Sequence, residues 1–321
     1  MRKLTTLALA LAMITAGSLT SCSRTESDTK PLTIGASVLG TSFPAVAAMD
    51  SGMKEKAKEL GVELVIVDAG GQASKQTNDV ADLLSRGVDG VIINAVDSKT
   101  VAASADAVTA AGIPLTSAFT TLGSAQCAYA GSVAHVGFDE AGWAKLQGSS
   151  AVTLLPDGGD VAIIDGSPGV QASKIRHDGF VAELKANQGI KVVASQPGNF
   201  DRATALTAME NILQANPGLD LVYAPDDNMA VGAIQAIDKA GLTGKIKVLG
   251  LGGSKDGLKA VQDGTMAATV YSSLKEGGAL AVETTVKKLR GEANGDEQCI
   301  TVAQALVDAN NVKDYIDKGE Y

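Results

Sequence analysis

The chain has 321 residues, 45% of them hydrophobic and 3% aromatic, with 36 glycines and a formal net charge of −9. This length is enough for two domains of about 100–150 residues each. The acidic residues are spread along the chain and no basic cluster is present, so the sequence predicts no nucleic-acid partner.

The N-terminal segment is typical of an export signal. Arg2 and Lys3 are followed by an apolar run over residues 4–16, which is too short to span a bilayer comfortably. The run ends in Leu19-Thr-Ser-Cys22, which resembles the bacterial lipobox at all four positions. This resemblance implies cleavage before Cys22, a lipid anchor on that cysteine, and an exported protein at the cell envelope, in the periplasm or on the outer face of a membrane. We therefore expect residues 1–21 to be a lipoprotein signal peptide and the polar residues 22–30 to be a flexible tether.

From Leu32 onward the pattern predicts alternating strands and helices. The β-branched run 91–93 is too short for a helix and apolar on both faces, as in a buried strand of a parallel sheet. In the first half we expect strands over 32–37, 63–67, 90–95, 113–117 and 132–137, with helices over 42–60, 74–86 and 99–111 between them. In the second half we expect helices from 139, 171, 202, 227 and 255, with strands over 160–165, 191–195, 219–224 and 246–251. A strand near 267–271, a helix over 275–290 and one strand near 300–306 are expected to finish the chain.

The two halves of the chain have the same predicted alternation of strands and helices. Strands that alternate with helices call for a parallel sheet covered on both faces. The predicted fold class is therefore α/β, with two similar doubly wound parallel-sheet domains.

Asn94 directly follows the buried run 91–93, at the carboxyl end of the predicted strand. Ligands of open α/β sheets bind at this edge, and a side-chain amide offers two donors and an acceptor to a hydroxylated or amide-bearing small molecule. A simpler interpretation, that Asn94 caps a loop, is equally compatible with its position.

No catalytic constellation is evident. The stretch 166–169 lacks the Gly-x-Ser-x-Gly pattern of a nucleophile elbow, and neither histidine, His135 or His177, lies in a suitable context. The sequence also has no cluster with metal-ligand spacing. We expect a protein that is not an enzyme and that needs no metal or other cofactor.

Four stretches resemble the type I periplasmic binding proteins of ABC importers, most of all the branch that binds ribose and related sugars. They are residues 73–98, 195–202, 224–230 and 263–270, which occur in order and at matching spacing. The resemblance covers about residues 32–307. It implies two lobes joined by a three-crossover hinge, one formed by 31–137 plus 273–299 and the other by 138–272 plus 300–321. It further implies that a small solute binds between them, that the hinge closes, and that the partner is an ABC permease.

The resemblance also implies which positions contact the ligand. Asn94 and Phe200 match family positions, whereas Phe119 and Thr120 stand where the family holds an Asp-Arg pair, and Gly252 where it holds an Asp. The implied ligand-binding residues are Asn94, Phe200, Asp226, Phe43, Phe119, Lys174, Ser272 and Phe138. With so many phenylalanines and so few charges, we expect a neutral, less hydroxylated or part-aromatic solute, such as a deoxy sugar, a short polyol or a nucleoside-like molecule.

Two other classes of protein have the fold that this resemblance implies. The effector-binding halves of bacterial repressors carry a helix-turn-helix in place of an export signal, which excludes them. A sensor that presents its ligand to a receptor or histidine kinase stays open as an alternative to import.

Cys127 and Cys299 are the two cysteines left once Cys22 is lipidated. Exported proteins favour disulfides, and the family mapping places both cysteines on the first-domain side of the crossovers. We expect a disulfide that ties the C-terminal crossover to the 119–131 loop. The alternative is two separate buried thiols.

Overall fold

The computed structural model describes residues 30–125, 127–292 and 298–321. The expected signal peptide, Cys22 and the tether up to residue 29 lie outside the described residues. None of the helices in the described ranges combines the length and apolarity needed to cross a membrane.

The first sheet has six strands that come from both ends of the chain. In spatial order they are β11 (Gln298–Thr301), β5 (Ala134–Gly137), β4 (Leu115–Ala118), β3 (Gly90–Ile93), β1 (Thr33–Val38) and β2 (Glu63–Asp68). All neighbouring pairs are parallel. The order 2-1-3-4-5 of its first five strands is that of a doubly wound fold.

The second sheet repeats this order. Its strands are β12 (Gln304–Asp308), β10 (Ala268–Ser272), β9 (Lys247–Leu249), β8 (Leu221–Tyr223), β6 (Gly159–Asp165) and β7 (Ile190–Pro197). The pairs are parallel except for β10 with β12, which run antiparallel. The predicted fold class, two similar parallel-sheet α/β domains, is confirmed.

Helices cover both faces of each sheet. On the first sheet, α1 (Pro44–Leu60) and α9 (Leu274–Leu289) share one apolar cluster, and α2 (Ala73–Ser85) and α3 (Ala102–Ala110) share another. On the second, α6 (Arg202–Ala215), α7 (Asp227–Lys239) and α8 (Lys255–Gln262) cover one face, and α4 (Glu140–Leu154) and α5 (Gln171–Leu184) the other. The short helices η1 (Val312–Asp314) and η2 (Ile316–Lys318) follow β12.

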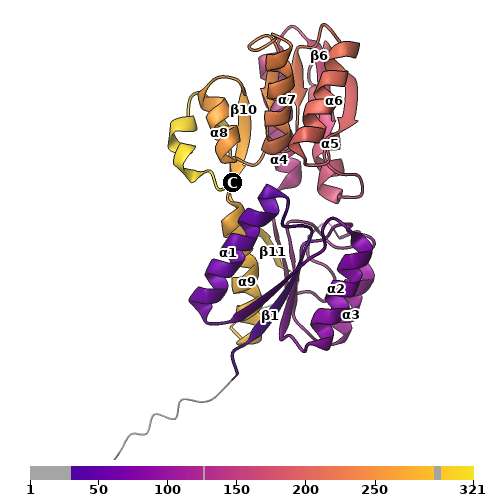
Figure 1. Cartoon of the computed structure of the whole chain (residues 1–321), viewed down its shortest axis with the longest axis vertical. Helices are drawn as coiled ribbons and strands as arrows, with labels where there is room; N and C mark the ends of the chain where they lie inside the picture. The colour runs from indigo at the N-terminus through magenta and orange to yellow at the C-terminus, as the bar shows by residue number, and fades with distance from the viewer. Residues whose placement is uncertain (1–29, 126, 293–297) are drawn as a thin grey trace, which may run out of the picture. The chain divides into compact units, whose positions relative to one another are not determined.

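Helices α1 and α9 lie side by side although they come from opposite ends of the chain (Figure 1). Their backbones approach so closely that a Cβ at Gly278 would collide with the carbonyl oxygen of Met49. Likewise, a Cβ at Gly52 would collide with the carbonyl oxygen of Lys275. This packing fixes the returning C-terminal segment against the first helix of the chain.

The chain passes between the sheets three times: between β5 and α4, between β10 and α9, and between β11 and β12. The expected single strand over 300–306 is wrong, because β11 pairs with β5 and β12 pairs with β10. Only Val302 and Ala303 separate the two strands. The third passage therefore falls at 302–303, two residues or more beyond the expected boundary at 299/300. The apolar pattern runs on through both strands and gives no sign of the change of sheet.

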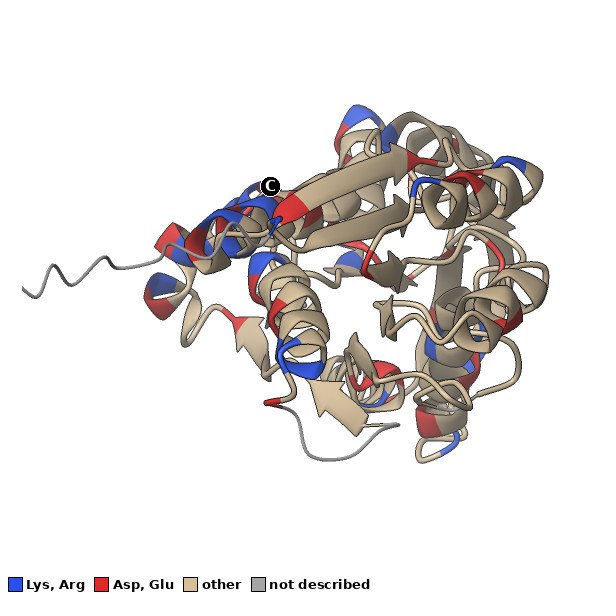
Figure 2. Cartoon of the chain, turned by 90° about the horizontal axis from the view of Figure 1, so that it is seen from below, with Lys and Arg blue, Asp and Glu red and all other residues tan. Residues whose placement is uncertain are grey.

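Basic and acidic residues are interspersed along the helices (Figure 2). Several form ion pairs four residues apart, such as Lys75 with Asp79 at 2.8 Å and Lys287 with Glu283 at 2.6 Å. Exposed pairs of this kind stabilise a helix by only about 0.3–0.5 kcal/mol each. The pattern is that of a solvated helix surface.

Candidate ligand-binding site

A cavity of about 110 Å³ lies at the carboxyl ends of strands from both sheets. Its wall includes Asn94 after β3 and Phe119 after β4 of the first sheet. From the second sheet come Asp226, shortly after β8, and Leu251, shortly after β9. In doubly wound sheets this edge is where ligands bind, because the loops there can converge without breaking the strand pairing.

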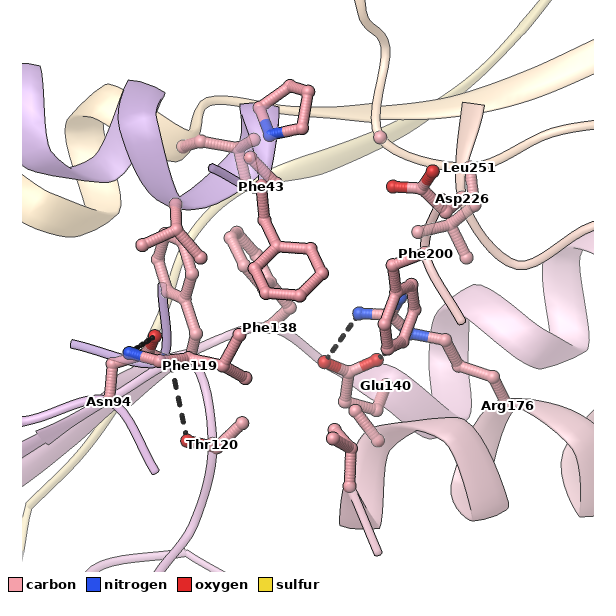
Figure 3. Close-up of a pocket in the computed structure, with 18 of the residues that line it drawn as sticks. Phe43, Asn94, Phe119, Thr120, Phe138, Glu140, Arg176, Phe200, Asp226 and Leu251 are labelled. Carbon is pink, nitrogen blue, oxygen red and sulfur yellow. Dashed lines mark hydrogen bonds and ion pairs between the residues drawn. The ribbon is translucent and has the colours of Figure 1, made fainter. Parts of the chain in front are cut away.

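Aromatic rings make up much of the wall. They belong to Phe43, Phe119, Phe138, Trp143, Phe200 and Tyr321. The rings of Phe119 and Phe138 lie 4.6 Å apart (Figure 3). The rings of Phe138 and Trp143 stack at 4.5 Å. Rings offer a ligand flat apolar faces, on which burial stabilises by about 25 cal/mol per Å². Four of the five phenylalanines in the sequence therefore meet at this one place, as the resemblance implied.

Two of these phenylalanines have strained backbones. Phe119 has φ of 62° and Phe200 has φ of 57°, next to Asn199 at 54°. They are the non-glycine residues with positive φ in the described part of the chain. Such conformations cost about 1–3 kcal/mol each and gather at functional sites, where the surrounding structure holds them. Here both strained residues line the cavity.

Arg176 of α5 and Glu140 of α4 form a bidentate ion pair in the wall (Figure 3). Arg176 Nε donates to one carboxylate oxygen at 2.5 Å and an Nη donates to the other at 3.0 Å. The other Nη donates to the carbonyl oxygen of Pro225 at 2.8 Å, and the guanidinium lies 5.0 Å from the centre of the Trp143 ring. Desolvation lowers the pKa of Arg176, but the charge and the hydrogen bonds of Glu140, with smaller contributions from Tyr223 and Asp226, raise it, and the net shift is upward. The cation is thus neutralised and held by protein groups.

Asp226 forms no ion pair with any side chain in the described part of the chain. Its side chain accepts a hydrogen bond from the backbone N–H of Met229 at 3.1 Å and so caps α7. Desolvation first, and repulsion by Asp227 to a smaller extent, raise the pKa of Asp226 to about 7. Because its carboxyl group points toward the cavity, Asp226 can accept hydrogen bonds from a ligand there (Figure 3).

Asp227 is built into the protein instead. It is fully buried and accepts hydrogen bonds from Thr269 Oγ1 at 2.6 Å and from the backbone N–H of Ser254 at 2.7 Å. Burial raises its pKa, which these two bonds oppose. The carboxylate therefore ties α7 to the loop after β9 and does not line the cavity.

Asn94 lines the cavity, but its amide is already bonded to the protein. Its Oδ1 accepts from the backbone N–H of Leu39 at 3.1 Å, and its Nδ2 donates to the carbonyl oxygen of Ala118 at 3.1 Å. A longer contact of 3.4 Å reaches Thr120 Oγ1. Asn94 thus links the ends of β1, β3 and β4. Of the two interpretations of Asn94, these contacts are those of a residue that fixes the loops.

Lys174 differs from its expected place. Its side chain is exposed, forms an ion pair with Asp178, and lies outside the cavity wall. The residue of α5 that lines the cavity is Arg176, two positions later. Since two residues turn a helix by about 200°, Lys174 and Arg176 point to nearly opposite sides. Lys174 therefore does not share the cavity with Asp226.

Ser272 also differs from its expected place. It is buried at the end of β10, where its hydroxyl donates to the carbonyl oxygen of Ala303 at 2.8 Å. It does not line the cavity. Ser272 instead links the second and third passages of the chain between the sheets.

Four charged or aromatic wall residues were not expected from the sequence: Arg176, Glu140, Trp143 and Tyr321. For Arg176 a signal was present, because it is four residues from both Ala172 and Phe180 and therefore lies on the apolar face of α5. Glu140 is the acidic first-turn residue of α4, a position that usually reflects only the helix dipole. Nothing in the pattern marks Tyr321.

Cys127 and Cys299 are joined in a disulfide, with 5.8 Å between their Cα atoms. Cys299 lies on the edge strand β11 and Cys127 in the loop between β4 and β5. The expected connection between the C-terminal crossover and the 119–131 loop is present in the structure.

A hydrogen bond joins a loop of the first sheet to a helix of the second beside the cavity. Thr121 Oγ1, shortly after β4, donates to Gln171 Oε1 at the start of α5 at 2.6 Å. In the described residues no group of three or more His, Cys, Asp or Glu side chains could hold a metal ion.

Comparisons with known proteins agree with this arrangement. Residues 34–293 match the family described as "Periplasmic binding protein domain". The chain is 35% identical to the ribose import binding protein of Bacillus subtilis over 264 residues, which cover 82% of this chain and 83% of the relative. It is 34% identical to that of Escherichia coli K12 over 292 residues, 91% of this chain and 94% of the relative.

Solved structures with the same fold are also similar in sequence. A solute-binding protein of an ABC transporter from Bacillus halodurans, with bound myo-inositol, has a TM-score of 0.85 and 29% identity, covering 91% of this chain and 99% of that one. One from Mycobacterium smegmatis, with bound glycerol, has a TM-score of 0.84 and 34% identity with the same coverage. These relatives are binding proteins, as expected for a chain that is not an enzyme. By the extent of both matches, this chain belongs to the periplasmic binding protein family.

Proposed function

We propose that this protein captures a small sugar or sugar-like solute outside the cytoplasm and delivers it to an ABC importer. The observation that carries the proposal is the cavity at the strand ends of both sheets, walled by rings and by the carboxyl group of Asp226, which forms no ion pair among the described residues. Relatives of the same family are named for ribose import or hold myo-inositol or glycerol. All three ligands are small, neutral and hydroxylated.

The wall favours a ligand with few hydroxyl groups and an apolar face. Asp226 offers acceptor oxygens to ligand hydroxyls, whereas three donors of Arg176 already serve Glu140 and Pro225. A fully hydroxylated ring would leave several of its groups against phenylalanine, where an unpaired polar group costs about 1–3 kcal/mol. We therefore infer a deoxy sugar, a short polyol or a nucleoside-like molecule.

Closure of the two lobes about the hinge would enclose the ligand. The proposed lobes are 31–137 plus 273–299 and 138–272 plus 300–321, with their later boundary moved to 302–303 to follow the strands. The hydrogen bond from Thr121 to Gln171 would help to hold the lobes together. A permease would then recognise the ligand-bound protein by the changed relative position of its lobes.

A lipid on Cys22 would keep the protein at the membrane. This proposal rests on the lipobox at residues 19–22 and on the polar tether. Cys22→Ala is expected to move the protein from the membrane fraction to the soluble fraction. A Cys22→Ala protein that still partitions with membranes would contradict the anchor.

A thermal-shift screen of sugars, polyols and nucleosides tests the ligand proposal, with Trp143, the single tryptophan, as a fluorescent reporter in the cavity wall. Phe119→Ala and Asp226→Ala should each weaken the best ligand at least about 10-fold. Lys174→Ala is the matched control, because Lys174 is exposed on α5 and lies outside the cavity wall. This variant should bind the ligand as wild type does. Micromolar binding of glucose or ribose that neither cavity variant affects would show that the ligand lies elsewhere.

A further inference from the structure

Tyr321, the last residue of the sequence, lies in the cavity wall. The segment after β12 returns through η1 and η2 and is fixed next to two helix N-termini. The carbonyl oxygen of Tyr321 accepts from the backbone N–H of Lys255 in α8 at 2.8 Å. Glu320 accepts from the backbone N–H of Lys275 in α9 at 2.8 Å and from the hydroxyl of Ser273. Residues 320–321 are thus bonded, through the Tyr321 backbone and the Glu320 side chain, to helices that cover different sheets.

The phenol of Tyr321 occupies space that a side chain at position 252 would need. Gly252 has φ of 126°, and a Cβ built there would collide with Tyr321 Oη. Both residues line the cavity. The corner next to β9 therefore presents a tyrosine hydroxyl to the cavity in place of a side chain from the strand end.

The hydroxyl of Tyr321 stays protonated. Desolvation first, and then the carboxyl groups of Asp226 and Asp227, hold the pKa of Tyr321 well above its usual value. A neutral phenol can both donate and accept one or more hydrogen bonds, unlike the carboxylate of Asp226, which only accepts when ionised. The two residues therefore offer complementary chemistry to one ligand.

We infer that Tyr321 is a specificity-determining residue of the cavity: its hydroxyl bonds to a polar group of the solute, and its ring limits the size of ligand that fits beside Gly252. The inference rests on the proposed function, the capture of a small sugar-like solute in this cavity. It differs from a purely structural role, in which Glu320 and the backbone anchor the segment and the hydroxyl is dispensable.

The test compares the full-length wild type with Tyr321→Phe and Tyr321→Ala. Ribose, 2-deoxyribose, myo-inositol, xylitol, glycerol and the nucleoside thymidine are titrated into each, with calorimetry and Trp143 fluorescence as readouts. Tyr321→Phe should weaken the best-bound probe about 3–10-fold, the effect of one lost hydrogen bond. Tyr321→Ala should raise the affinity for myo-inositol relative to glycerol at least about 10-fold, because it enlarges the corner. Tyr315→Phe is the matched control, because Tyr315 lies in the same segment, packs on Tyr271 at 5.2 Å and is outside the cavity wall.

The outcomes separate the two proposals. If wild type binds a probe and Tyr321→Phe binds it equally well, or if Tyr315→Phe weakens it as much, the role of Tyr321 is overturned and the proposed function stands. If neither wild type nor any variant binds a probe, the proposed function fails and the inference with it. If only Tyr321→Ala gains binding, the size limit is supported. Should Tyr321→Ala fail to fold, Tyr321→Phe decides.

Discussion

Arg176 grips both carboxylate oxygens of Glu140, and each side chain of the pair is only 12% exposed. The two residues belong to neighbouring helices, α5 and α4, and stand in the wall of the cavity. Breaking such a pair leaves one charge buried without a partner, which costs far more than losing an exposed pair.

We expect Glu140→Gln and Arg176→Met each to lower the free energy of unfolding by about 3–5 kcal/mol. The double variant should recover part of the loss, because no uncompensated charge remains. Urea denaturation of the three variants measures the coupling. Lys174→Met breaks the exposed pair with Asp178 on the same helix and should leave stability nearly unchanged. Single losses no larger than that of Lys174→Met would contradict the buried pair.

Asp226→Asn should become stabilising as the pH rises. The pKa of Asp226 is raised to about 7, so between about pH 4 and 7 the folded state binds more protons than the unfolded state. Its contribution to stability therefore falls as the pH rises through this window, by about 2–4 kcal/mol in all. Asparagine removes the titration and can still cap α7 through its side-chain oxygen.

The measurement is the difference in unfolding free energy between Asp226→Asn and wild type from pH 4.5 to pH 8. Asp201 provides the matched control, because it caps α6 in the same way but its pKa is lowered by its bonds to Thr204. Asp201→Asn should show no gain as the pH rises. The groups that act on Asp226, apart from the backbone, are Asp227 and Arg176. A flat difference curve for Asp226→Asn would show that the carboxyl group is solvated.

His135 should make the protein sensitive to acid. It lies on β5, its Nδ1 is 2.9 Å from Ser117 Oγ, and desolvation lowers its pKa to about 4. Between about pH 6.5 and 4 the unfolded state binds the proton more readily, so stability falls as the pH falls, by about 2–3 kcal/mol. His135→Asn should lose this slope. Because Asp226 acts in the opposite direction over an overlapping range, the two effects are separated only by comparing variants, and an unchanged acid slope in His135→Asn would contradict the assignment.

The disulfide between Cys127 and Cys299 closes a loop of 172 residues. Its removal in Cys127→Ser/Cys299→Ser should lower the free energy of unfolding by roughly 2–5 kcal/mol. In a Cys22→Ala background these two are the only cysteines, so thiol titration of unfolded, unreduced protein should find no free thiol. Two free thiols in that titration would show that the bridge does not form.

The sequence by itself determined the fold class, and it placed the candidate cavity at one edge of the sheets. The β-branched run at 91–93 and the repeated strand-helix rhythm predicted parallel sheets, because a strand buried on both faces is apolar at every position. The same local logic predicted Asn94 at a strand end, and the family resemblance gave Phe43, Phe119, Phe138 and Phe200, all of which line the cavity.

Tertiary structure alone decided which polar groups meet in that cavity. Whether Lys174 or Arg176 lines the cavity depends on how α5 is rotated about its own axis against the sheet. Two residues further along a helix, a side chain points in nearly the opposite direction. The split of one apolar run into β11 and β12 depends on pairing with strands far away in the sequence. Tyr321 reaches Gly252 only because the whole fold returns the last segment to the strand ends. The local sequence pattern predicts which side of a segment is buried. These contacts depend on how segments far apart in the sequence are placed in space, which the local pattern does not predict.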